Sequence, residues 1–179
     1  METIIGLLEG YGLATDTAKP IAAIIAIFLI AALSILANFI TKKIVIRILT
    51  HYIKRNRFNW DNVLLERKVF HKLSHIVPAI IIYMFAAAFP DYQVLIEKAA
   101  VTYILVVSLL VISSFLSAVD DIYRTFEISK IRPIKSYIQV LKIVVFFIGG
   151  IIIISNIIGQ SPLIILGGIG ALSAVFMLV

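Results

Sequence analysis

Long stretches without charge constrain this chain more than any other feature of its sequence. Residues 20–40 and 99–119 contain no Asp, Glu, Lys or Arg, and neither do residues 143–179. A helix of about 20 apolar residues is long enough to cross the hydrocarbon core of a bilayer. Hydrophobic residues make up 61% of the 179 residues, which is more than the core of a soluble domain needs. The sequence therefore predicts an integral membrane protein.

Five membrane-spanning helices are predicted, so the expected fold is an all-α five-transmembrane-helix bundle. The spans are residues 20–40, 73–89, 99–119, 137–158 and 162–179. Pro20 suits the first turn of the first helix, which is expected to continue past Ile40. Pro78 is expected to bend the second helix. Residues 1–19 are predicted either to form a short amphipathic helix on the membrane surface or to be disordered.

Basic residues gather in two of the connecting segments. Of the 16 Lys and Arg residues, nine lie in residues 41–72 and five lie in residues 120–142. Because positively charged loops stay in the cytoplasm, both segments are predicted to be cytoplasmic. Residues 1–19 are then a periplasmic segment, so the N-terminus is expected outside and the C-terminus inside. Residues 20–158 are expected to form a four-helix membrane paddle.

The first basic segment is predicted to contact lipid headgroups. A run of basic side chains continues beyond the first span, where it meets the anionic cytoplasmic leaflet. Its members are Lys42, Lys43, Arg47, Lys54, Arg55 and Arg57. The net charge of +6 therefore indicates membrane topology and lipid partners, and no nucleic-acid partner is expected.

No enzyme activity and no cofactor are predicted. The chain has no cysteine, which excludes disulfides and thiolate chemistry, and it has neither an HExxH motif nor a glycine-rich phosphate loop. Among the polar side chains inside predicted spans are Asn38, Ser155 and Asn156. They either line a substrate path or, as is more usual, form hydrogen bonds between helices.

Two pairs of ionisable side chains are candidates for a metal site or for a proton or cation path. His71 and His75 are four residues apart, a spacing that places two imidazoles on one helical face for a metal; the alternative is a pair of histidines at a lipid interface. Asp120 and Asp121 end the third span, where paired carboxylates serve proton or cation paths. The alternative is that they remain solvated or pair with Arg124.

Small residues crowd into the last span. They are Gly167, Gly168, Gly170, Ala171, Ser173 and Ala174. Four of them, Gly167, Gly170, Ala171 and Ala174, follow the i, i+3, i+4, i+7 spacing of one helical face. Such a face lets helices approach closely, either inside an ordinary bundle or between identical copies around an axis. In the second case a ring of copies forms a pore closed by apolar side chains, which requires a homo-oligomer.

The segment NIIGQSPLIILGGIGALSAVFMLV, residues 156–179, resembles the start of the pore-lining helix in the small-conductance mechanosensitive channel family. It is most similar to the five-helix miniconductance branch, as are FHKLSH and PIKSYIQVLKIVVFFIGGIIIISNIIGQSP. The resemblance implies a homo-heptamer in the bacterial inner membrane that membrane tension opens during osmotic downshock. Permeating ions and small osmolytes would be its cargo.

The resemblance also implies roles for residues of the last span. Residues 159–179 would begin the pore-lining helix, with Gly167, Gly170, Ala171 and Ala174 packing against neighbouring copies. Leu178 and Ala174 match the hydrophobic constriction positions, although a larger residue usually stands at the second of these in the founding branch.

The chain departs from the family in length. Family members continue through a kinked second half of the pore helix into a β-rich cytoplasmic chamber, which is absent here, so a truncation is expected. Two other functions were considered. One is a non-conducting membrane bundle that acts as an anchor or tension sensor. The other is a secondary transporter subunit, which is disfavoured because no repeat and no intramembrane charge was found.

Overall fold

The structure is a computed structural model that describes residues 2–53 and 60–178. All secondary structure in these two ranges is helical. The elements are α1 (Glu2–Gly10), α2 (Thr15–Ile53), α3 (Trp60–Glu66), α4 (Val69–Leu73), α5 (Ile76–Phe85), η1 (Ala86–Ala88), η2 (Pro90–Tyr92), α6 (Gln93–Arg124), η3 (Glu127–Lys130), α7 (Lys135–Ile158) and α8 (Pro162–Leu178). The predicted all-α architecture is confirmed for this part of the chain.

Four segments of the described chain are long and apolar enough to cross a membrane. They are Thr15–Ile44, Val69–Ala88, Pro90–Arg124 and Lys135–Ile158. The chain is therefore compatible with a multi-pass membrane protein. The helix α8 is apolar but has only 17 residues, so the fifth span stays a prediction.

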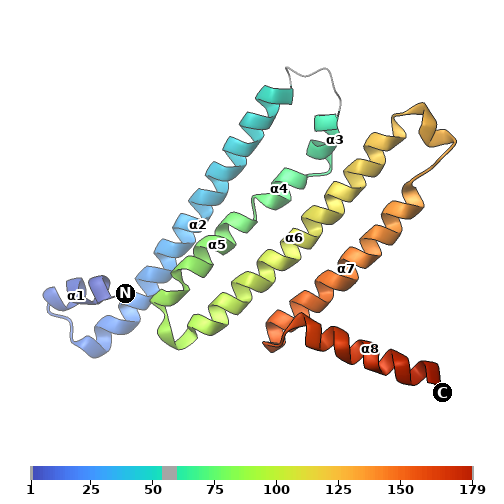
Figure 1. Cartoon of the computed structure of the whole chain (residues 1–179). Coiled ribbons are helices and arrows are strands. Elements are labelled where there is room, and N and C mark those ends of the chain that lie inside the picture. The colour runs from blue at the N-terminus through green and yellow to red at the C-terminus, as the bar shows by residue number, and fades with distance from the viewer. Residues whose placement is uncertain (1, 54–59, 179) are drawn as a thin grey trace.

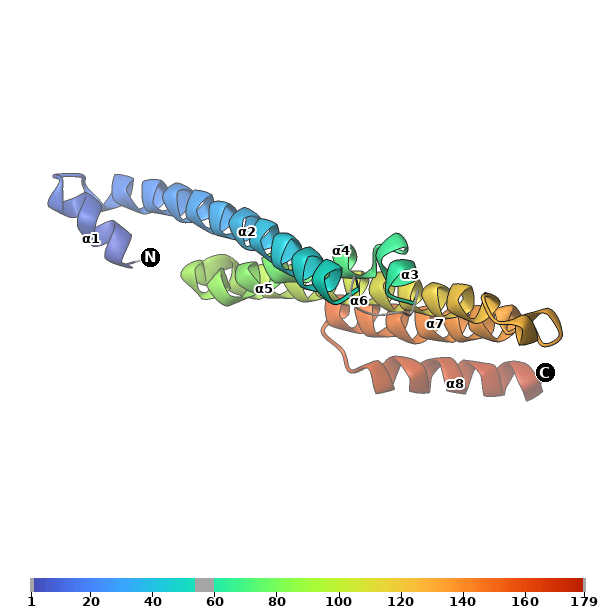
Figure 2. The same cartoon turned by 90° about the horizontal axis from the view of Figure 1, so that it is seen from above.

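The long helices form a row in the order α2, α5, α6, α7 (Figure 1). Each contacts its neighbour in the row, and within the described residues α2 contacts neither α6 nor α7. Seen from above, the row is a thin, stepped layer, with α8 below α7 (Figure 2). The four long helices thus form a single layer, and many of their large apolar side chains are exposed.

Contacts within this layer are made largely by small side chains. Seven of the ten buried hydrophobic residues are alanines, for example Ala79, Ala100 and Ala118. Small residues let helix backbones approach closely where apolar surroundings remove the hydrophobic drive for association. The helices α6 and α7 approach closely at Gly149, because a Cβ placed there would overlap the side chain of Leu109.

Two details of the first helices differ from the sequence prediction, and two agree with it. The first long helix begins at Thr15, so Pro20 lies inside it. Because proline has no N–H, the carbonyl of Asp16 has no helical donor, but Asp16 is exposed. The bend expected at Pro78 lies instead at residues 74–75, between α4 and α5, because the proline ring clashes with the carbonyl four residues earlier. The predicted continuation beyond Ile40 is confirmed, and of the two alternatives for residues 1–19 the structure contains a helix, at Glu2–Gly10.

Candidate functional site

The turn before α8 is built by two residues with special backbone properties. Gly159 adopts the left-handed conformation, with φ of 78°, and ends α7. The backbone N–H groups of Gly159 and Gln160 both donate to the carbonyl of Ser155, at 2.8 and 3.0 Å. Pro162 then occupies the first position of α8, where its missing N–H costs nothing. As a result α8 leaves the row in its own direction (Figure 1).

The small-residue face of α8 has no partner within the described chain. No residue of α8 is buried, and the only element in contact with it is α7. A Cβ placed at Gly167 or Gly170 would meet nothing within 4 Å. Ala171, Ala174 and the predicted constriction residue Leu178 are likewise exposed. These five positions are therefore free to contact something outside this chain.

The predicted lipid-interface residues lie on the second half of α2 as far as the structure describes them. Lys43 and Arg47 are exposed and Lys42 is half-buried. The ammonium of Lys43 lies 5.9 Å from the centre of the Phe39 ring. The other three predicted members, Lys54, Arg55 and Arg57, lie outside the described residues.

A polar stripe follows the C-terminal part of α6. It consists of Ser114, Ser117, Asp120, Asp121 and Arg124, whose spacing of three, four and seven residues keeps them on one side of the helix. Asp120 accepts hydrogen bonds from Arg124 one turn later, the closest at 2.9 Å. This pairing is the alternative to a proton path that the sequence left open for Asp120.

Asp121 pairs with a residue far away in the sequence. Arg67, in the turn between α3 and α4, donates two hydrogen bonds to its carboxylate, from Nε at 2.5 Å and from Nη2 at 2.8 Å. The hydrogen bond to Asp121 raises the pKa of Arg67 above its usual value, so the guanidinium is always charged. This ion pair joins the stripe to the turn after α3.

Two lysines reach the same stripe from opposite neighbours of α6. Lys72, on α4, donates a hydrogen bond to the hydroxyl of Ser114 at 2.5 Å. Lys142, on α7, donates to the hydroxyl of Ser117 at 2.6 Å. Both lysine residues are half-buried, and Ser114 is buried. No carboxylate within the described residues forms a salt bridge with either lysine.

The other candidate groups form local contacts. The rings of His71 and His75 meet edge to face, with centroids 5.3 Å apart. In the part of the chain that the structure describes, no third residue completes a group that could hold a metal ion.

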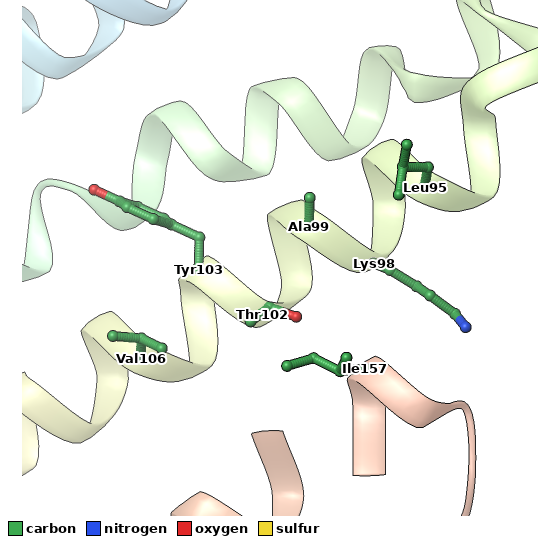
Figure 3. Close-up of a pocket in the computed structure, with 7 residues that line it drawn as sticks. All are labelled: Leu95, Lys98, Ala99, Thr102, Tyr103, Val106 and Ile157. Atoms are coloured by element: carbon green, nitrogen blue, oxygen red, sulfur yellow. The ribbon is translucent and has the colours of Figure 1, made fainter. Parts of the chain in front are cut away.

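Polar groups inside the row join α7 to α6. The amide nitrogen of Asn156 donates to the Thr102 hydroxyl at 2.9 Å and to the Lys98 carbonyl at 3.2 Å, which is the interhelical bonding expected from sequence. Figure 3 shows the groove beside these groups, where Lys98 extends toward the turn that follows α7. Buried oxygens of Ser34, Asn38 and Ser155 have no hydrogen-bond partner among the described residues.

Arg67, Lys72 and Lys142 all contact the polar stripe of α6, although the sequence pattern indicated only that they set the membrane topology. The spacing of Ser114, Ser117 and Asp121 is a signal that a polar face exists on α6. The basic partners could not be identified, because they belong to other helices.

Comparisons with known proteins identify no family for the chain. No protein-family model matches it, and no solved structure matches it either.

Proposed function

We propose that this chain is the membrane part of a homo-oligomeric, tension-gated channel in which α8 lines the pore. The observation that carries the proposal is the small-residue face of α8, which has no partner among the residues that the structure describes. Glycine weakens a helix unless close contact compensates for it. Neighbouring copies of α8 around a central axis would supply that contact.

The row of α2, α5, α6 and α7 supports a role in sensing tension. Large apolar side chains such as Phe28, Phe115 and Phe147 are exposed along it, as suits a paddle that lies in lipid. An open state that occupies more membrane area than the closed state is favoured when tension rises, because tension acts as a ligand that prefers one state.

The assembly and its setting follow from the sequence resemblance. We propose a heptamer in the bacterial inner membrane, with the N-terminus outside and α8 as the fifth span. The C-terminal end of α2 and the connection between α6 and α7 lie at one end of the row (Figure 1), which suits two basic segments on the cytoplasmic side. Leu178 and Ala174 would form the apolar constriction, which gates ion and osmolyte flow by dewetting.

Cysteine cross-linking tests the assembly directly, because the chain has no natural cysteine. A Gly170→Cys variant in native membranes is expected to form disulfide-linked dimers between copies under oxidation. Phe147→Cys, on the exposed face of α7, is the matched control and is expected to remain monomeric. Amine cross-linking of the unmodified chain is expected to yield a ladder of seven bands.

Patch recording tests the gating. Liposomes that contain the chain are expected to show currents that rise with suction. A chain that stays monomeric in both cross-linking experiments and passes no current under tension would be a non-conducting membrane bundle, and the channel proposal would be wrong.

A further inference from the structure

We propose that the groove between α6 and the last turn of α7 binds one anionic phospholipid. The phosphate lies on the ammonium of Lys98, and one acyl chain follows the groove along α6. No residue of α8 lines this groove, so the site would be present whether or not the chain conducts ions.

The first argument is the shape and chemistry of the groove. Its volume is about 490 Å³, which is within the range of about 300–1,000 Å³ that is usual for small-molecule sites. Besides Lys98 it is lined by Leu95, Ala99, Thr102, Tyr103, Val106 and Ile157 (Figure 3). The Thr102 hydroxyl already accepts a hydrogen bond from Asn156. The groove is therefore suited to a hydrocarbon chain.

The second argument is the charge of Lys98. The residue is half-buried, and no carboxylate among residues 2–53 and 60–178 forms a salt bridge with it. The carboxylate of the adjacent Glu97 accepts a hydrogen bond from Gln93 instead, at 2.8 Å. A lysine ammonium has three donors, and a phosphate oxygen accepts charge-assisted hydrogen bonds from such a group.

The position of the ammonium leaves room for a headgroup. The Nζ atom of Lys98 lies 3.2 Å from the point that a Cβ on Gly159 would occupy. Gly159 has no side chain there, and its φ of 78° favours glycine. The ammonium therefore lies beside the turn after α7, with the apolar groove extending from it along α6 (Figure 3).

The third argument is depth. Residues 99–119 of α6 contain no charge and are about 32 Å long as a helix, which matches a hydrocarbon core of about 30 Å. Lys98 comes directly before this stretch, at the level of the headgroups. Val106 lies eight positions later, or about 12 Å deeper, within the hydrocarbon. The ammonium and the groove thus match the depths of a lipid phosphate and its acyl chain.

Native mass spectrometry of the purified chain in detergent tests the site. Phosphatidylglycerol is titrated, diacylglycerol is the probe that lacks phosphate, and glycerol 3-phosphate is the probe that lacks chains. The unmodified chain is expected to retain phosphatidylglycerol in preference to diacylglycerol, and glycerol 3-phosphate is expected not to displace it. K98Q should weaken phosphatidylglycerol binding about fivefold or more, because a charged contact is lost.

Two pairs of variants separate the headgroup contact from the chain contact. K98R keeps the charge and should retain binding, while K135Q removes an exposed charge at the far end of α7 and should have no effect. V106W fills the deep part of the groove and should weaken binding, whereas I143W, on an exposed position of α7, should not.

The proposal is overturned if K98Q or V106W, with native helicity, binds phosphatidylglycerol as the unmodified chain does. It is also overturned if diacylglycerol binds equally well or if glycerol 3-phosphate displaces the lipid.

Discussion

Arg67 and Asp121 form a two-pronged ion pair that joins the turn after α3 to the last turn of α6, across 54 positions of sequence. Planar two-point contact between guanidinium and carboxylate fixes the orientation of both side chains. The pair therefore adds a specific contact between the α3–α4 turn and α6, near the hydrogen bond from Lys72 to Ser114.

We expect the Arg67–Asp121 pair to contribute modestly to stability. The two side chains are 46% and 30% exposed, so water screens their attraction, and a coupling of about 0.5–1 kcal/mol is expected. A double-mutant cycle with Arg67→Gln and Asp121→Asn, measured by thermal unfolding in detergent, gives this value. Added salt should reduce the coupling, and additive single effects would contradict the prediction.

Substitution of Gly149 should separate α6 from α7. Gly149→Ala introduces a methyl group into the space of Leu109, and the overpacking is expected to destabilise the chain by about 1–3 kcal/mol. Gly150→Ala is the matched control, since a Cβ there meets nothing within 4 Å, and it should be neutral or gain up to about 1 kcal/mol in helix propensity. Thermal unfolding by circular dichroism measures both.

A second substitution identifies the cause of that loss. Leu109→Ala in the Gly149→Ala background should recover part of the stability, because it removes the overlapping side chain. Equal melting temperatures for Gly149→Ala and Gly150→Ala would show that α6 and α7 do not approach this closely.

The hydrogen bonds of Asn156 should couple α7 to α6. Asn156→Leu removes the bonds to Thr102 and to the Lys98 carbonyl. Interhelical hydrogen bonds in membrane proteins average about 0.6 kcal/mol, so a cycle with Thr102→Val should give a coupling of that size. Gln160→Ala, at an exposed position of the following turn, should leave stability unchanged. Independence of the two substitutions would contradict the contact.

The orientation can be tested with single cysteines. Tyr11, in the turn after α1, is 86% exposed, and Ile131, in the connection between α6 and α7, is 81% exposed. A membrane-impermeant thiol reagent should label Tyr11→Cys in intact cells, and Ile131→Cys only after the membrane is permeabilised. The opposite labelling pattern would reverse the predicted topology.

The surface of α8 can be tested without affecting the fold of one chain. Gly170→Leu and Gly168→Leu should both leave the helicity of the monomer unchanged, because both glycines face open space. Only Gly170→Leu should abolish the cross-linked ladder, because Gly168 lies off the face formed by Gly167, Gly170, Ala171 and Ala174. Equal loss in both variants would argue against that face as the contact surface.

The sequence by itself determined the long apolar helices and the segments in which basic residues gather, but not the short helix α3 inside the predicted loop 41–72. Hydropathy and charge are local properties, so residues 99–119 and 137–158 could be recognised without any knowledge of their neighbours. The continuation of the first helix to Ile53 followed in the same way. The exact position of the bend in the second span was harder to predict. It was expected at Pro78 and lies at residues 74–75.

Only the tertiary structure decided which helices are neighbours and which side chains meet. The pairing of Arg67 with Asp121, and the approach of Lys72 and Lys142 to one stripe of α6, depend on contacts between residues 25 to 54 positions apart. Spacing along one helix predicts a face but not its partner. For the same reason, glycine spacing predicted the small-residue face of α8, but not whether another part of the chain covers it. Only the row of α2, α5, α6 and α7 showed that no element in residues 2–53 and 60–178 does so.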